Sequence, residues 1–153
     1  LRILAMVLSS GGKLMVGVLA RLDGELEPTH VAQLKRLGDW YRPRKSLFRD
    51  ATPIRYAGLR PGGVRVEGAE VDVVASRYAD GVLLHFVNRR GWRSDLRITL
   101  GGRHWQAAKG VRHMPSGRPL DVQVDGGKRH VTIPGDAVDP VDTILYVEGV
   151  HTC

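Results

Sequence analysis

The stretch that decides the fold runs from position 11 to position 41 and reads GGKLMVGVLARLDGELEPTHVAQLKRLGDWY. Residues 13–19 form a nearly continuous apolar run, which is typical of a strand covered on both faces, as in parallel sheets and α/β barrels. The following Asp23-Gly24 is a strong turn dipeptide, and Pro28 suits the first turn of a helix. We therefore expect a buried strand, an exposed loop and then a helix.

The helix expected after the loop is amphipathic. Its apolar residues recur at three- and four-residue spacing on one face: Val31, Leu34, Leu37, Trp40 and Tyr41. The other face is polar: Gln33, Lys35, Arg36 and Asp39. The helix should end at or before Arg42, because Pro43 disfavours a helical backbone in the residue before it.

The first residues of the chain predict another helix. Residues 1–8 are almost entirely apolar, and Ser9-Ser10-Gly11-Gly12 resembles a helix C-terminus. Residues 1–45 are thus expected to be a helix–strand–helix piece of something larger. Because one such unit cannot bury both of its faces alone, we expect exposed apolar surface on residues 1–19 and poor solubility of residues 1–153 in isolation.

From about Ala51 the pattern changes to short segments rich in β-branched residues, separated by Gly, Pro and Asp turns. This spacing is typical of an all-β sandwich or barrel. We predict a mainly β protein, with an antiparallel β-sandwich over residues 51–149 and a boundary within residues 42–51. The expected strands cover residues 64–67, 71–75, 82–87, 95–100, 121–124, 130–133 and 143–147.

Composition narrows the classes of function. The net charge is +7, but five of the 23 basic residues are Lys and the rest are Arg, scattered along the chain. Scattered arginine does not predict nucleic-acid binding. No apolar run reaches the roughly 18 residues that span a bilayer, so no membrane partner is expected. The single Cys153 excludes a disulfide within the chain. The compartment and the oligomeric state stay open.

A few residues invite a chemical interpretation. The six histidines lack the spacing of a zinc site, and His85 is expected to be a core residue of an apolar strand. Asp136, Asp139 and Asp142 lack the pattern of a calcium loop and are expected in turns. Neither a metal nor a cofactor is predicted. Trp92 and Trp105 flank the strand at 95–100 and are candidate platforms for a sugar, with core packing as the alternative.

Residues 12–26, Gly-Lys-Leu-Met-Val-Gly-Val-Leu-Ala-Arg-Leu-Asp-Gly-Glu-Leu, resemble the last barrel strand and loop of the α-L-fucosidases of glycoside hydrolase family 29. Those typically read Gly-Asn-Leu-Leu-Leu-Asn-x-Gly-Pro-x-x-Asp-Gly-x-Ile. Residues 34–41 resemble the family's Leu-x-x-Ile-Gly-x-Trp-Leu, with Gly38 and Trp40 in place. Residues 84–88 and 139–147 also resemble strands of the sandwich that closes such enzymes. The resemblance implies that residues 1–45 are the incomplete C-terminal end of a (β/α)₈ barrel.

The sequence departs from the family at positions near the sugar pocket. Lys13 and Gly17 stand where the family has Asn, and Leu19-Ala20 stands where it has Gly-Pro. These departures put the substrate and the activity in question. Because the C-terminal ends of barrel strands line the active site, the resemblance implies that Arg21 and Asp23 lie at the pocket rim and bind sugar hydroxyls. A turn internal to the loop is the alternative.

The resemblance also implies a retaining mechanism, with two carboxyl groups about 5 to 5.5 Å apart. No residue matches the nucleophile or the acid/base, so no catalytic residue is assigned, and whether the chain is an enzyme stays open. One hypothesis makes it the C-terminal fragment of a fucosidase-like hydrolase that cleaves terminal fucose from glycoconjugates, inactive alone and meeting its carbohydrate through the parent barrel. The alternative is a non-catalytic sandwich that binds carbohydrate or a partner domain.

Overall fold

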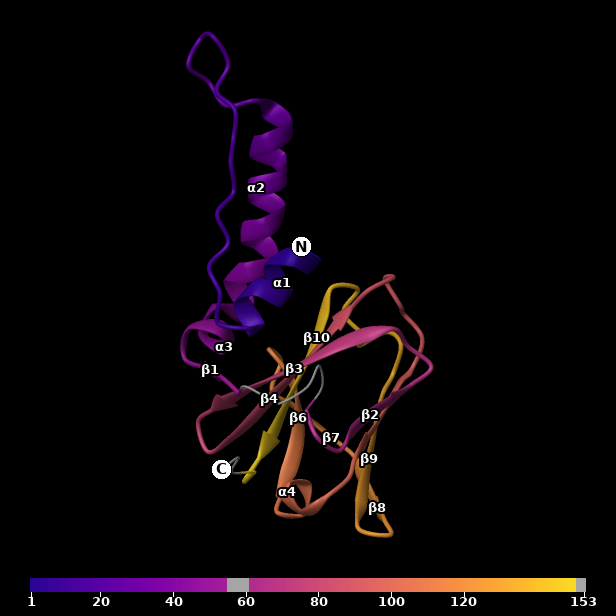
Figure 1. Ribbon diagram of the computed structural model, residues 1–153. Helices are drawn as coiled ribbons and strands as arrows, with labels where there is room; N and C mark the ends of the chain where they lie inside the picture. The colour runs from indigo at the N-terminus through magenta and orange to yellow at the C-terminus, as the bar shows by residue number, and fades with distance from the viewer. Residues whose placement is uncertain (55–60, 151–153) are drawn as a thin grey trace.

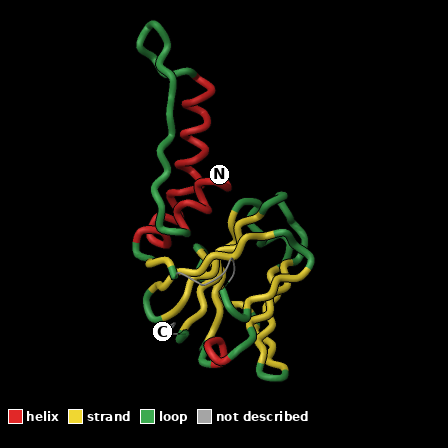
Figure 2. Tube along the Cα trace, viewed as in Figure 1, coloured by secondary structure: helices red, strands yellow, loops and turns green. Residues whose placement is uncertain are grey.

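The structure is a computed structural model that describes residues 1–54 and 61–150. A two-layered β-sandwich forms its body, and an N-terminal arm (residues 1–44) stands on one face of the larger sheet (Figure 1). Figure 2 shows the same division by secondary structure, with helices concentrated in the arm and strands in the body. The predicted fold class, a mainly antiparallel β protein with a small helical part, is confirmed.

The sandwich consists of two antiparallel sheets. The six-stranded sheet has the order β1 (Thr52–Pro53), β3 (Val71–Tyr78), β4 (Gly81–Asn88), β10 (Asp142–Glu148), β6 (Gly110–Met114) and β7 (Arg118–Leu120). The four-stranded sheet has the order β2 (Val64–Glu67), β5 (Leu96–Leu100), β9 (Lys128–Ile133) and β8 (Val122–Asp125). All seven predicted strand segments of this region are strands in the structure, with bounds that differ by a few residues.

The core lies between the two sheets and is built from alternating side chains. In β5, Leu96, Ile98 and Leu100 are buried while Arg97 is exposed, as expected for a strand with one face in the core. β4 differs, because all of its residues are buried. Its second face is covered by the arm and by α3 (Lys45–Arg49), so the apolar run of β4 reflects burial on both sides.

The helical elements begin with α1 (Arg2–Ser9), followed after a long loop by α2 (Pro28–Tyr41). The C-terminus of α1 is followed by Gly11 with φ +74°, the left-handed conformation predicted there. α2 ends at Tyr41, one residue before Arg42, as predicted. A short 3₁₀ helix, η1 (Arg42–Arg44), and α3 (Lys45–Arg49) then lead to the sandwich, and neither was anticipated. The division into domains at 1–45 and 51–149 stays a prediction.

The buried strand predicted at residues 13–19 is wrong for this chain. The segment belongs to no sheet, and an isolated bridge between Ala20 and Leu26 follows it. It runs along α2 as a loop (Figure 2), and Met15 and Leu19 are 95% and 72% exposed. A strand needs neighbours to pair its backbone groups, and the described residues supply none beside this segment.

The elements missed within the sandwich lack a strong apolar pattern. β1 and β7 are short and contain Pro53 and Pro119, which suit their places as edge strands. β6 carries Arg112 and His113 within five residues. Among residues 61–150, the one helix is α4 (Arg103–Gln106), which has a single turn.

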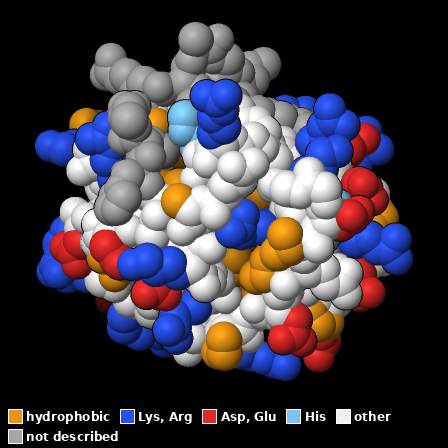
Figure 3. Space-filling model, turned by 90° about the horizontal axis from the view of Figure 1, so that it is seen from below, with side chains coloured by type: hydrophobic (Ala, Val, Ile, Leu, Met, Phe, Trp, Pro, Cys, Tyr) orange, Lys and Arg blue, Asp and Glu red, His pale blue; other side chains and the backbone are white. Residues whose placement is uncertain are grey.

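The surface carries charges of both signs. On the face seen in Figure 3, basic and acidic side chains alternate rather than gather in one patch. Among the described residues, no helix is long and apolar enough to cross a membrane.

Candidate functional site

The loop that carries Arg21 and Asp23 forms the tip of the arm, far from the sandwich (Figure 1). Its turn closes through the Arg21 amide, which donates to the Glu25 carbonyl at 2.7 Å, and the Gly24 amide, which donates to the Arg21 carbonyl at 2.9 Å. Gly24 has φ +83°, a conformation that favours glycine. The Asp-Gly signal therefore identified a real turn.

Arg21 and Asp23 lie close together and contact each other, within the turn at the tip of the arm. Arg21 Nη2 lies 3.4 Å from Asp23 Oδ2, and both side chains are half exposed. Asp23 Oδ1 also accepts a hydrogen bond from the Glu25 amide at 3.1 Å. The bonds shown are those of a loop-internal turn, and the exposed edges of both side chains remain accessible to a ligand.

The arm presents an apolar face without a covering layer. Ile3, Met15 and Leu19 are each at least 72% exposed, and no residue of α2 is buried. A groove between α1, residues 14–16 and α2 is also lined almost entirely by apolar side chains: Leu4, Leu8, Leu14, Val16, Leu37 and Tyr41. Such a face is typical of a surface that packs against more protein. This is the exposed surface predicted for residues 1–19.

Arg44 connects the base of the arm to the sandwich through an ion pair with Asp139. Its Nη2 donates to Asp139 Oδ2 at 2.6 Å, and its Nη1 donates to the Trp40 carbonyl at 2.8 Å. The guanidinium also lies 4.8 Å from the centre of the Trp40 ring, a favourable cation–π arrangement. The Arg44 and Asp139 side chains are only 12% and 20% exposed, so this ion pair is screened less than a surface pair.

A buried histidine lies beside this junction. His85 Nδ1 lies 2.9 Å from Asp142 Oδ2, and neither side chain is exposed. Phe48 of α3 stacks on the His85 ring with centroids 5.4 Å apart. His85 is thus the core residue that the sequence predicted, and Asp142 is its partner.

A second histidine, His113 on β6, is partly buried near the same junction. Burial lowers the pKa of His113, and Arg118 and Arg44 lower it further, whereas Asp139 opposes the shift. The folded chain therefore favours the neutral form of the His113 imidazole.

The two candidate tryptophans occupy different environments. Trp105 is 2% exposed in the sandwich core and donates its Nε1–H to the Gly62 carbonyl at 3.0 Å, so its ring has no face for a sugar. Trp92 is partly exposed in the loop before β5. Asn88 holds this loop, since its Oδ1 accepts from the Trp92 amide at 2.9 Å and its Nδ2 donates to the Trp92 carbonyl at 2.8 Å. Of the two, only Trp92 keeps ring surface for a ligand.

Several functional contacts were missed from the sequence. Asp139 was assigned to a turn, and its Oδ1 does accept from the amides of Val141 and Asp142. Its ion pair with Arg44 spans 95 positions, and no local pattern signals such a contact. Among residues 1–54 and 61–150, no group of three His, Cys, Asp or Glu side chains is placed to hold a metal ion.

The fold is similar to that of α-L-fucosidases. No protein-family model and no curated protein matches the sequence. Among solved structures, Thermotoga maritima α-fucosidase in complex with a mechanism-based inhibitor aligns with 95% of this chain at TM-score 0.69 and 21% identity. A structure described as alpha-L-fucosidase aligns over the same share at TM-score 0.67 and 20% identity. A Thermotoga maritima α-L-fucosynthase aligns at TM-score 0.68 and 19% identity.

The chain spans about a third of the length of these neighbours, between 31% and 33%. At this level of identity the likeness establishes the fold. It includes the arm as well as the sandwich, because 95% of the chain aligns. The fold of this chain is thus similar to that of one portion, about a third, of the α-L-fucosidase structures.

Proposed function

We propose that this chain is the C-terminal part of a retaining, α-L-fucosidase-like glycoside hydrolase that removes terminal fucose from glycoconjugates. The observation that carries the proposal is the uncovered apolar face of the arm, together with a fold match that spans 95% of this chain and only a third of the fucosidases. In this proposal the missing two thirds include the barrel strands that flank residues 13–19. Those strands would cover Met15, Val16 and Leu19.

The catalytic carboxylates belong, in this proposal, to residues outside 1–153. The arm contributes the last strand and helix of the barrel, and its tip contributes Arg21 and Asp23 to the pocket rim. The sandwich supports the barrel through the Arg44–Asp139 pair and the Phe48–His85 stack. The proposed partner is a carbohydrate substrate, which binds at the barrel of the parent enzyme.

The test compares the complete reading frame with residues 1–153 on an aryl α-L-fucoside. The complete protein is expected to turn over the substrate, and residues 1–153 alone are expected to show none. Arg21→Gln in the complete protein should raise KM, with Arg65→Gln on the sandwich as its control. Turnover by residues 1–153, or its absence in a folded complete protein, would contradict the proposal.

A second candidate function rests on Trp92. It lies beside a polar groove at one end of the four-stranded sheet, lined by Glu67, Asp95, Arg97 and Asp136 among others. Trp92 Cζ2 lies 3.8 Å from where a Cβ of Gly68, another lining residue, would stand. Acidic and basic side chains next to an aromatic ring suit a non-catalytic carbohydrate site. Trp92-dependent fluorescence quenching by fucose or an oligosaccharide, abolished in Trp92→Phe and kept in Trp105→Phe, would favour this function.

A further inference from the structure

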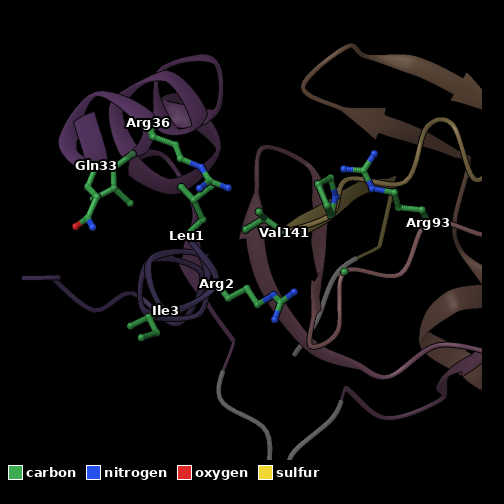
Figure 4. Close-up of a pocket in the computed structure, with 10 residues that line it drawn as sticks. Leu1, Arg2, Ile3, Gln33, Arg36, Arg93 and Val141 are labelled. Atoms are coloured by element: carbon green, nitrogen blue, oxygen red, sulfur yellow. The ribbon is translucent and has the colours of Figure 1, made fainter. Parts of the chain in front are cut away.

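An open cleft separates the base of the arm from the sandwich. Its lining comes from four segments of the chain: residues 1–3 at the start of α1, residues 33–37 of α2, and the loops that hold residues 91–93 and 140–141. Figure 4 shows the side chains of Arg2 and Arg36 directed from the arm into this space, with Arg93 on the opposite wall. The lining residues between them include Leu1, Leu37 and Val141, which give the cleft an apolar floor.

The three arginines bring positive charge to the cleft without a matching carboxylate. No Asp or Glu is among its lining residues. The acidic side chains nearby lie outside the cleft: Asp39 pairs with Arg42 and Asp139 pairs with Arg44. Arg93 also borders the polar groove that contains Glu67, Asp95 and Asp136, and Arg2 also borders a neighbouring pocket that contains Asp72. Arg2 and Arg36 on one wall and Arg93 on the other therefore carry positive charge into a cleft whose own lining holds no carboxylate.

The donors of these arginines are largely unused. Within residues 1–54 and 61–150, neither the Arg36 guanidinium nor the Arg93 guanidinium makes a hydrogen bond or ion pair. Arg2 uses Nη1 to donate to the Arg89 carbonyl at 2.5 Å, which fixes its direction and leaves its other nitrogens for a ligand. Three guanidinium groups with free N–H groups are suited to one anion of more than one charge.

We propose that this cleft binds a sulfate or phosphate ester. Guanidinium forks match the paired oxygens of such groups, which carry charge on several oxygens at once. The apolar floor formed by Leu1, Leu37 and Val141 would contact the organic body that carries the ester. The site is separate from the tip of the arm where Arg21 and Asp23 lie, and its occupation does not depend on the proposed fucosidase activity.

The test is a titration of the natural full-length protein, measured by isothermal titration calorimetry at low salt. The probes are glucose 6-sulfate, glucose 6-phosphate, inorganic sulfate and inorganic phosphate, with glucose as the uncharged control. Saturable binding in the millimolar range or tighter is expected for the esters, weakened by added salt. If the free ions bind as tightly as the esters, the cleft recognises only the oxyanion, and the proposed contact with an organic body is wrong. If the sugar esters bind more tightly, the cleft also contacts the organic body that carries the ester.

Variants then locate the site. Arg36→Gln and Arg93→Gln should each weaken binding about fivefold, because each removes a charged donor. The matched controls, Arg65→Gln on β2 and Arg103→Gln on α4, remove exposed arginines outside the cleft and should leave binding unchanged. The proposal is overturned by a lack of saturable binding in the folded protein, or by equal losses in the cleft and control variants. Aryl-fucoside turnover, measured on the same variants, reports separately on the fucosidase proposal.

Discussion

The sandwich and the arm use apolar residues in opposite ways. In the sandwich, alternating strands bury their apolar side chains between two sheets, and residues such as Leu84, Ile98 and Leu145 are at most 1% exposed. In the arm, α2 buries no residue, and Met15 and Leu19 lie almost fully open. The sandwich therefore buries its own apolar side chains, whereas the arm leaves many of its apolar side chains open to water.

This difference shows that an apolar run specifies burial but not the partner that provides it. β4 and residues 13–19 are both nearly continuous apolar segments. β4 pairs with β3 and β10 and is covered on both faces, so it is a strand. Residues 13–19 have no flanking strand among the described residues and remain a loop. The same signal gives two structures because one segment has neighbours and the other does not.

The largest expected difference in stability is between truncating a side chain in the sandwich and truncating one in the arm. Phe86→Ala in β4 should cost about 3–5 kcal/mol of unfolding free energy, because it leaves a cavity in a packed core. Leu34→Ala in α2, which is 36% exposed, should cost less than about 1 kcal/mol in residues 1–153. Urea denaturation followed by circular dichroism measures both values. Equal costs would show that the arm has a closed core of its own.

The sequence predicted the strands of the sandwich because their signals are local. Alternation over 95–100 and the glycine turns between segments require no knowledge of distant contacts. The missed β7 holds three residues, one of which is Pro119. Its position is determined by pairing with β6, from Val111↔Leu120 to His113↔Arg118. Such an edge strand is defined by its neighbour rather than by its own composition.

The candidate site was less predictable. The turn around Asp23-Gly24 was visible because its chemistry lies within four residues. The Arg44–Asp139 pair and the arginine cleft join residues separated by about 50 to 100 positions. Trp105 and Trp92 also had equal claims as sugar platforms by sequence, and only burial distinguishes them. Sites assembled by packing cannot be found from local spacing alone.

The next largest effect tests how the two regions are joined. Arg44→Ala should cost about 2–3 kcal/mol, because it leaves the poorly exposed Asp139 carboxylate with backbone donors only and removes a contact with Trp40. Arg42→Ala, which breaks the exposed pair with Asp39, is the matched control and should leave stability unchanged within error. Both are measured by urea denaturation. A cost for Arg42→Ala as large as that for Arg44→Ala would contradict the assignment of the junction to Arg44.

A smaller effect is expected from pH. Burial lowers the pKa of His113 in the folded chain below its unfolded value of about 6.5. The folded state then binds fewer protons than the unfolded state, so the stability from the neutral form is present above that value and is lost as pH falls below it. Thermal unfolding between pH 7.5 and pH 5 should show this loss. His113→Gln should flatten the slope, whereas the control His104→Gln should keep it. A slope unchanged by His113→Gln would exclude His113 as its source.

The smallest effect on stability is expected from substitutions on the exposed apolar face of the arm. These substitutions also test most directly whether the arm, unlike the sandwich, lacks a covering partner. Met15→Gln and Leu19→Gln should change the unfolding free energy of residues 1–153 by less than about 0.5 kcal/mol, because both side chains already meet water. They should nevertheless raise the monomer fraction in light scattering, since they remove apolar contact surface. The control Val124→Gln, at a residue 66% exposed on β8, should have a smaller effect on association. In a complete barrel the first two substitutions should instead destabilise the protein, because added strands would bury those positions. If they remain neutral there, the arm is not the closing unit of a barrel, and its apolar face needs a different partner.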